Sequence, residues 1–279
     1  MFKILSKEEL SPNVYAYQID APRVARKAQP GQFIILRTNE EGERIPLTIA
    51  DFDREKGTIL IVFQVIGATT MKLAAMQVGD SLADFVGPLG RPSVIQKLDG
   101  AMVVVGGGIG VAPTYPIARA MKEAGNKVIA IMGAKTKDIL IMEDQMKQVT
   151  DEILVTTDDG SRGIKGFVTY AVQALVDRGE KIGQITAIGP VIMMKSVADA
   201  TRESGIPTVV SLNPIMVDGT GMCGGCRVTV GGETKFACVD GPEFDGHAVD
   251  FKGLMSRQRM YRDLEAEEKD HVCRIGLGR

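Results

Sequence analysis

Short apolar segments separated by glycine and proline turns dominate the first hundred residues. Strands of this length and spacing are typical of a small barrel or sandwich. A helix is expected at residues 69–76, because they contain no helix breaker. The pattern predicts an antiparallel β-barrel over residues 1–96, with strand candidates at residues 14–19, 32–38, 45–53 and 58–66.

Beyond residue 100, short apolar segments alternate with longer helical ones, which predicts a parallel sheet covered by helices on both faces. We place this α/β domain at residues 97–212. Its strand candidates are residues 101–105, 127–132, 152–157, 184–188 and 207–211, and its helix candidates include residues 167–177 and 191–202.

The pattern changes again in the third region, residues 213–279. Residues 213–246 are rich in glycine, hold three of the chain's four cysteines and have little apolar periodicity. Such a segment has no core of its own and needs a metal or cluster to hold its shape. Residues 250–274 predict a charged terminal helix. The predicted fold is therefore a β-barrel, a parallel α/β sheet and a small cysteine-containing lobe with a terminal helix.

Composition excludes several classes of protein. The 279 residues include 33 basic and 35 acidic side chains, so no basic face for nucleic acid is implied. Apolar stretches fall far short of the roughly 18 residues that span a bilayer, and the first residues lack the apolar core of a signal peptide. We expect a soluble, cytoplasmic protein with neither a membrane nor a nucleic acid as partner.

The strongest chemical signal is Cys223-Gly-Gly-Cys226 with Cys238 twelve residues further on. A pair of this spacing also occurs in thioredoxin-like redox sites and in zinc sites. Plant-type [2Fe–2S] sites use Cys-x4-Cys-x2-Cys and a distant fourth cysteine. Asp218 stands at the first position of that pattern. We predict a [2Fe–2S] cluster held by Asp218, Cys223, Cys226 and Cys238, and treat Cys273 as the alternative fourth ligand.

A second signal is the glycine run Gly106–Gly110, which follows a buried strand and precedes a helix that contains Pro113. Glycine lets the backbone approach a pyrophosphate, and the helix start offers amide donors. A tight strand-to-helix turn explains the run equally simply. The spacing departs from Gly-x-Gly-x-x-Gly, which indicates a different nucleotide-binding version of the sheet.

Two further segments complete an ordered set of motifs. These are Arg44-Ile-Pro-Leu-Thr48 on a barrel strand and Gly67-Ala-Thr-Thr70 at a helix start, the second of which is also an ordinary threonine N-cap pattern. With the glycine run and Gly189-Pro190-x-x-Met193, they resemble the ferredoxin–NADP reductase superfamily of flavin enzymes. The C-terminal cysteine segment narrows the resemblance to electron-transfer subunits similar to that of dihydroorotate dehydrogenase.

The resemblance implies sites for FAD and NAD(H). The residues expected around the FAD are Pro46, Leu47 and Thr48 at the isoalloxazine, Val62, Phe63 and Gln64 along the ribityl chain, and Gly67, Thr69 and Thr70 at the pyrophosphate. Those expected around the nicotinamide dinucleotide are Gly107, Gly108, Gly110, Ala112 and Pro113, with Asp158, Gly160, Gly189 and Pro190 closing the site. Thr48 is the catalytic candidate, with its hydroxyl near flavin N5. The superfamily arginine that binds pyrophosphate falls on or beside Ile45, so Arg44 is only its neighbour.

The implied activity is electron transfer. Hydride passes between nicotinamide and flavin without a general base, and the flavin exchanges single electrons with the [2Fe–2S] cluster. The resemblance also implies a larger iron–sulfur flavoprotein subunit, where electron bifurcation takes place and through which ferredoxin and NADP(H) react. The alternatives are the electron-transfer subunit of dihydroorotate dehydrogenase itself and, from another class, a non-catalytic zinc-stabilised binding module.

Overall fold

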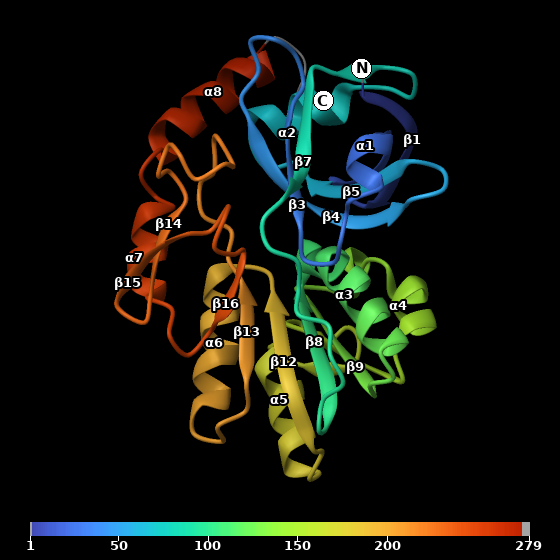
Figure 1. Ribbon diagram of the computed structural model, residues 1–279, viewed down its shortest axis with the longest axis vertical. Helices are drawn as coiled ribbons and strands as arrows, with labels where there is room; N and C mark the ends of the chain where they lie inside the picture. Colours follow the sequence, from blue (N-terminus) through green and yellow to red (C-terminus); the bar gives the residue numbers. More distant parts are fainter. Residues whose placement is uncertain (1, 275–279) are drawn as a thin grey trace.

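A seven-stranded antiparallel sheet forms the N-terminal third of the protein, in a computed structural model that describes residues 2–274 (Figure 1). The strand order is β6-β1-β2-β5-β4-β3-β7, as expected for a near-closed barrel. Its elements are β1 (Phe2–Ser11), β2 (Val14–Asp20), α1 (Pro22–Ala25), β3 (Phe33–Arg37), β4 (Ile45–Asp53), β5 (Thr58–Gln64), α2 (Ala68–Ala75), β6 (Ser81–Leu82) and β7 (Asp84–Leu89). The predicted barrel is confirmed. Strand β1 was not predicted, because its charged side chains obscure the apolar alternation.

The barrel interior orients helix α2. Tyr17 is fully buried in the barrel core, and its hydroxyl donates to the carbonyl of Leu73 at 3.0 Å and to that of Met76 at 3.2 Å. These carbonyls belong to the C-terminal end of α2, where helix carbonyls lack intrahelical partners. The tyrosine therefore fixes one end of α2 on the barrel and leaves the other end beside the loop that follows β5.

The second sheet has the order β11-β10-β9-β8-β12-β13-β16, and its pairs are parallel except β13 with β16. Helices cover both faces, as predicted. The side chains of β8 show why: Val103 and Val105 pack with α5 and α6, whereas Met102 and Val104 pack with α3 and α4. The elements are β8 (Ala101–Gly107), α3 (Val111–Glu123), β9 (Val128–Ala134), α4 (Glu143–Val149), β10 (Glu152–Thr157), β11 (Ile164–Lys165), α5 (Val168–Asp177), β12 (Ile182–Ile188), α6 (Val191–Arg202), β13 (Thr208–Ser211) and β16 (Glu243–Asp245), with single 3₁₀ turns at η1 (Gly108–Gly110) and η2 (Lys137–Ile139).

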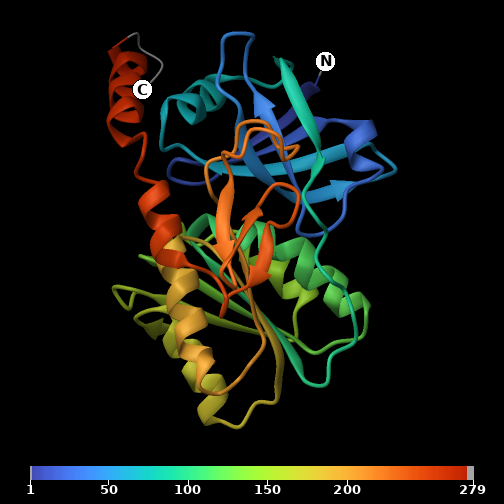
Figure 2. The same ribbon diagram turned by 60° about the vertical axis from the view of Figure 1, so that its left-hand side comes forward.

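The third region has no separate sheet-and-helix core. It forms a hairpin, β14 (Arg227–Val230) and β15 (Glu233–Phe236), and supplies β16 to the second sheet. The expected terminal helix is two helices, α7 (Phe251–Arg257) and α8 (Arg262–Arg274). They separate because they pack on different partners: Phe251 and Leu254 of α7 join the core of the second sheet, while Val272 of α8 is buried against α2 (Figures 1 and 2).

The barrel and the second sheet are joined by a shared core. Val62 and Ala50 of the barrel pack with residues of α3 in one cluster. At its edge, Arg119 of α3 forms an ion pair with Asp51 of β4, at 2.7 Å. This packing brings one end of the barrel against the carboxyl ends of the parallel strands, where open α/β sheets bind their ligands.

No helix within residues 2–274 is both long and apolar enough to cross a membrane.

Glu243 of β16 lies where the barrel, the linker after β7 and the second sheet meet. Its carboxylate accepts a hydrogen bond from Ser93 Oγ at 2.5 Å, and burial raises the pKa of Glu243. A carboxyl whose pKa is raised by folding stabilises the protein below its unfolded pKa of about 4.3, and this contribution is lost as the pH rises through the folded pKa.

We therefore expect Glu243→Gln to match the wild type in thermal unfolding midpoint near pH 4 and to exceed it at pH 8. Glutamine keeps an acceptor for Ser93 and needs no charge in this site. Thermal unfolding followed by circular dichroism at both pH values measures the difference. Glu41→Gln, at an exposed glutamate, is the control. An equal difference between Glu243→Gln and wild type at both pH values would contradict the expectation.

Candidate functional site

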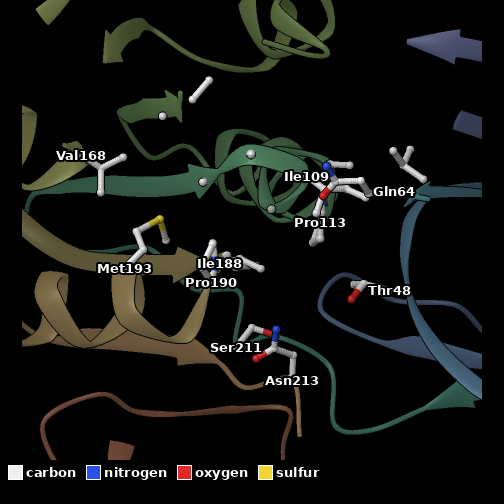
Figure 3. A pocket seen from close by; sticks show the side chains of 18 of the residues that line it. Thr48, Gln64, Ile109, Pro113, Val168, Ile188, Pro190, Met193, Ser211 and Asn213 are labelled. Atoms are coloured by element: carbon white, nitrogen blue, oxygen red, sulfur yellow. The ribbon is translucent and has the colours of Figure 1, made fainter. Parts of the chain in front are cut away.

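A cavity of about 1050 Å³ lies between the barrel and the carboxyl ends of the parallel strands (Figure 3). Three parts of the chain form its walls: strands β4 and β5 of the barrel, the glycine loop with the neighbouring strand ends of the second sheet, and the segment that follows β13. Most predicted cofactor-binding residues line it, namely Pro46, Leu47, Thr48, Val62, Phe63, Gln64, Thr70, Gly107, Gly108, Gly110, Ala112, Pro113, Asp158, Gly189 and Pro190.

The barrel wall is built by antiparallel pairing. Thr48 lies opposite Phe33 of β3, and Val62 and Phe63 lie opposite residues of β2. Thr48 and Gln64 are at the barrel side of the cavity, across from Ile188 and Pro190 (Figure 3). The wall combines an apolar surface with a few polar groups at its edge, which suits a flat aromatic ring system with polar substituents.

Of the residues predicted at the start of α2, only one lines the cavity. Thr70 lines the cavity, whereas Gly67 and Thr69 do not. Thr70 Oγ1 accepts hydrogen bonds from the amides of Ile66, at 2.9 Å, and Gly67, at 3.1 Å, and Thr69 Oγ1 donates to Glu43. The N-cap residue is Gly67 rather than a threonine, and Thr70, at the third helical position, closes the helix start by bonding back to it, so any anion here is left to the amides of the first turn.

The glycine loop fits both interpretations of its sequence, the tight strand-to-helix turn and the pyrophosphate-binding loop. A Cβ at Gly110 would lie 2.1 Å from the carbonyl oxygen of Ile188, and one at Gly107 would lie 2.2 Å from Met193 Sδ, so close packing alone requires glycine there. Gly108 differs: its φ is +56°, and a Cβ there would have no atom within 4 Å, so its backbone faces open cavity. A loop of this kind gives a pyrophosphate room to approach.

The two residues predicted in the turn after β10 also differ in whether they line the cavity. Asp158 lines the cavity, whereas Gly160 does not. Asp159 accepts hydrogen bonds from the amide of Ser161 at 2.9 Å and from its hydroxyl at 2.7 Å, which is an ordinary turn contact. Lys135, directly after β9, also lines the cavity and was missed, because a single lysine after a strand carries no sequence signal.

The third wall was not predicted from the sequence. It is made by residues of the segment after β13 and by Phe33 of β3: Ser211, Asn213, Met216, Pro242 and Phe33. Ser211 and Asn213 are seen opposite Thr48 in Figure 3. Phe33 and Met216 also pack in one buried cluster with Ile35, Ala237, Cys226 and Cys238. The cavity and the cysteine loop therefore share side chains.

The three predicted cysteine ligands lie in this loop. Cys223 is exposed, and hydrogen bonds from the amides of Gly225, at 3.4 Å, and Asp218 lower the pKa of its thiol. Cys226 and Cys238 are buried beside each other, with the Cys238 amide 3.4 Å from Cys226 Sγ. Burial and the neighbouring sulfur raise the pKa of Cys238 to about 12. A bound cation removes that cost by deprotonating the thiols, so the donor set fits a metal cluster.

Asp218 lies near Cys223, and its backbone amide contributes to the lowered pKa of the Cys223 thiol. Its carboxylate accepts hydrogen bonds at Oδ2 from the amide of Thr220, at 3.0 Å, from the Thr220 hydroxyl, at 2.6 Å, and from the amide of Met222, at 3.2 Å. These bonds and the nearby charge of Arg44 keep the pKa of Asp218 below its ordinary value, so the carboxylate is ionised. Within residues 2–274, no three His, Cys, Asp or Glu side chains converge on the position of a single metal ion.

Two other candidates lie elsewhere. Cys273 is exposed on α8, the helix that packs on α2 through Val272 and through the Lys72–Glu268 ion pair at 3.1 Å. Arg44 does not line the cavity; its Nε donates to the carbonyl of Val217 at 2.8 Å. The arginine of the flavin motif is therefore directed toward the cysteine loop.

Matches to three known domain families cover most of the chain. Residues 1–93 match the oxidoreductase FAD-binding domain, residues 104–199 the oxidoreductase NAD-binding domain, and residues 213–250 the iron–sulfur cluster binding domain of dihydroorotate dehydrogenase B. The boundaries of these matches fall near the transitions between the barrel, the second sheet and the cysteine loop.

Similar proteins cover almost the whole chain. An uncharacterised Clostridium beijerinckii protein is 54% identical over 100% of this chain and 98% of its own. A Thermotoga maritima homologue of the dihydroorotate dehydrogenase B electron transfer subunit is 51% identical over 94% of this chain and 92% of its own. A chain of the NADH-dependent reduced ferredoxin–NADP oxidoreductase, solved to study flavin-based electron bifurcation, is 49% identical with a TM-score of 0.93, covering 98% of both chains.

The fold and the cavity define a flavin- and nicotinamide-binding oxidoreductase of the ferredoxin–NADP reductase type with a C-terminal iron–sulfur domain. More narrowly, the chain belongs to the family of dihydroorotate dehydrogenase B electron transfer subunits and their homologues. It is thus an NAD(H)-dependent oxidoreductase subunit with domains for FAD, NAD(H) and an iron–sulfur cluster, as the motifs predicted.

The glycine contacts predict unequal effects of two neighbouring substitutions. Gly110→Ala places a methyl group against the Ile188 carbonyl, so the loop and the end of β12 must separate, at a cost of about 1–3 kcal/mol in the free energy of unfolding. Gly108→Ala meets open space and costs only about 1 kcal/mol for its left-handed backbone. Urea denaturation of both variants measures the difference. A Gly110→Ala protein as stable as the wild type would show that this approach is not required.

Proposed function

We propose that this chain is the NAD(H)-linked small subunit of an electron-bifurcating NADH-dependent ferredoxin:NADP oxidoreductase, also called the sulfide dehydrogenase small subunit. The proposal is supported by 49% identity and a TM-score of 0.93 to a chain of that enzyme, over 98% of both chains. The electron transfer subunit of dihydroorotate dehydrogenase B is the second candidate. This candidate is favoured by the 51% identical Thermotoga maritima homologue of that subunit. It is also favoured by the match of residues 213–250 to the iron–sulfur cluster binding domain of dihydroorotate dehydrogenase B.

The observation that carries the proposal is the layer formed by Phe33 and Met216. Both residues line the cavity, and both pack in the buried cluster that contains Cys226 and Cys238. A flavin in the cavity and a cluster on the cysteines would be separated by a single layer of side chains. Such an arrangement suits electron transfer between two groups, and a zinc-stabilised binding module has no need of it.

Each wall of the cavity has a separate task in this proposal. The bound FAD supplies the exchange between the hydride of NAD(H) and single electrons. Thr48 lines the barrel wall of the cavity, where its hydroxyl would orient the edge of the flavin ring, and Pro46 and Leu47 would provide an apolar surface for that ring. The other residues assigned to the flavin are Val62, Phe63, Gln64, Gly67, Thr69 and Thr70.

The opposite wall holds the nicotinamide dinucleotide. The residues that would receive the pyrophosphate are Gly107, Gly108, Gly110, Ala112 and Pro113, and those that would close the site are Gly189, Pro190, Asp158 and Gly160. Asp158 brings a carboxylate to the cavity, which would accept a hydrogen bond from a ribose hydroxyl. Because Lys135 brings a positive charge to the same cavity, the assignment of NAD(H) rather than NADP(H) rests on the family and not on this carboxylate.

The partner is a larger iron–sulfur flavoprotein subunit, through which ferredoxin and NADP(H) react. The surface around the exposed Cys223 fits such a contact. Met222 is 88% exposed and Val217 51% exposed, and both flank the cysteine loop. Apolar side chains that surround a redox site on the surface exclude water when another protein binds there.

The activity is tested on the native complex, purified with its larger subunit and assayed anaerobically. We expect NADPH to reduce ferredoxin only when NAD⁺ is also present, because the two reductions are coupled in a bifurcating enzyme. Reduction of NAD⁺ by dihydroorotate, without ferredoxin, would support the second candidate instead. A colourless protein that contains zinc and lacks flavin and iron would refute both.

The ligand assignment gives a separate prediction. Asp218→Ala should lose or markedly alter the electron paramagnetic resonance signal of the reduced cluster, because an oxygen ligand is removed, while Asp218→Cys should keep a cluster with a shifted signal. Cys273→Ala should leave the signal unchanged, since Cys273 lies on α8. Loss of the cluster in Cys273→Ala, with a normal signal in Asp218→Ala, would reverse the assignment.

A further inference from the structure

Arginine side chains from separate parts of the fold donate to backbone carbonyls of the cysteine loop. Arg44, just before β4, binds the carbonyl of Val217 at 2.8 Å, and Arg227 binds that of Gly224 at 3.2 Å. These two carbonyls belong to the peptide groups whose N–H ends belong to Asp218 and Gly225. The Gly225 amide donates to Cys223 Sγ at 3.4 Å, and Asp218 is itself a proposed cluster ligand.

The planar peptide group connects these contacts. In a trans peptide the C=O and the N–H point in opposite directions, so a donor that fixes the oxygen also fixes where the N–H points. A cation at the oxygen polarises the peptide and strengthens the hydrogen bond that its N–H donates. Arg227 therefore aims the Gly225 amide at the Cys223 sulfur, and Arg44 fixes the orientation of the peptide that leads into Asp218, a proposed cluster ligand.

Arg44 differs from Arg227 in its reach and its surroundings. It belongs to the barrel and immediately precedes the strand residues that line the cavity, whereas Arg227 lies within the loop region itself and is exposed. The Arg44 side chain is 31% exposed, and its Nη1 lies 3.6 Å from the carboxylate of Asp84, which also pairs with Arg37 at 2.7 Å. Arg44 thus joins the flavin strand to the peptide of a cluster ligand.

We propose that Arg44 is a positioning residue for the iron–sulfur cluster: it holds the Val217–Asp218 peptide in place and raises the reduction potential of the cluster. The proposal rests on the proposed cluster ligands Asp218, Cys223, Cys226 and Cys238. A cluster with four anionic ligands is net negative and becomes more so on reduction, so a nearby cation and hydrogen bonds to its sulfurs favour the reduced form.

The test is a redox titration of the cluster in the native complex, followed by electron paramagnetic resonance. Arg44→Gln removes the positive charge and weakens the hydrogen bond to the Val217 carbonyl. We expect at least a tenfold fall in the reduced-to-oxidised ratio at a fixed potential, about 59 mV for a one-electron couple. Arg44→Lys keeps the charge and should recover most of that ratio. FAD content should stay equal to wild type in both variants, since Arg44 does not line the cavity.

Arg37→Gln is the matched control, because Arg37 pairs with the same Asp84 and has a barrel position like that of Arg44, but its hydrogen bond goes to Glu40 rather than to the cysteine loop. We expect its ratio to stay within about twofold of wild type, as for a surface ion pair. An unchanged ratio in Arg44→Gln, or an equal change in Arg37→Gln, would overturn the proposal.

Iron content and circular dichroism cover the remaining outcomes. Loss of iron in Arg44→Gln, with normal folding and with iron retained in Arg44→Lys, supports the positioning role. Global unfolding of both Arg44 variants shows that the residue is only structural and overturns the proposal. Absence of a [2Fe–2S] signal from the wild-type complex instead refutes the proposed cluster itself, so the two failures are distinguishable.

Discussion

Packing of the cysteine loop against strand β3 is the constraint on which the site depends. Gly219 lies so close to the barrel that a Cβ there would stand 2.7 Å from Ile35 Cδ1 and 2.8 Å from Leu89 Cδ1. Ile35 and Phe33 then form one buried cluster with Cys226 and Cys238. The strand that supports the barrel wall of the cavity through its pairing with β4 therefore also supports Cys226 and Cys238. A shift of this loop would move both sites relative to each other.

The same arrangement explains why the C-terminal region needs no core of its own. Its strand β16 extends the second sheet, α7 packs into the core of that sheet, and α8 packs on α2 of the barrel. In Figure 2 the loops of this region lie across both larger units. The region is held by the surfaces of the two larger units, and its glycines allow the loop that carries the cysteines to turn tightly. Electron transfer benefits because each group is positioned by the same rigid framework.

The prediction of the two sheets succeeded where side-chain period and chain length agree. The valines of β8 alternate between two helical layers, and the apolar strand followed by glycines and a helix matched the observed order. Strand β1 was missed because its exposed positions are charged, and the terminal helix was predicted as one element because nothing in residues 258–261 is a strong breaker. Its division follows from two different packing partners, which a local pattern does not encode.

By itself, the sequence determined which chemistry the chain carries, because cysteine spacing, the glycine run and the ordered flavin motifs are local and depend on backbone and ligand geometry. Most of the cofactor-binding residues that it predicted do line the cavity. Only the tertiary structure decided that Phe33 and Met216 lie between the cavity and the cysteines, that Gly160 and Thr69 lie outside the cavity, and that Arg44 is directed to the cysteine loop. Arg44 and Val217 are 173 residues apart, and contacts at such a distance arise from packing of whole elements rather than from local sequence.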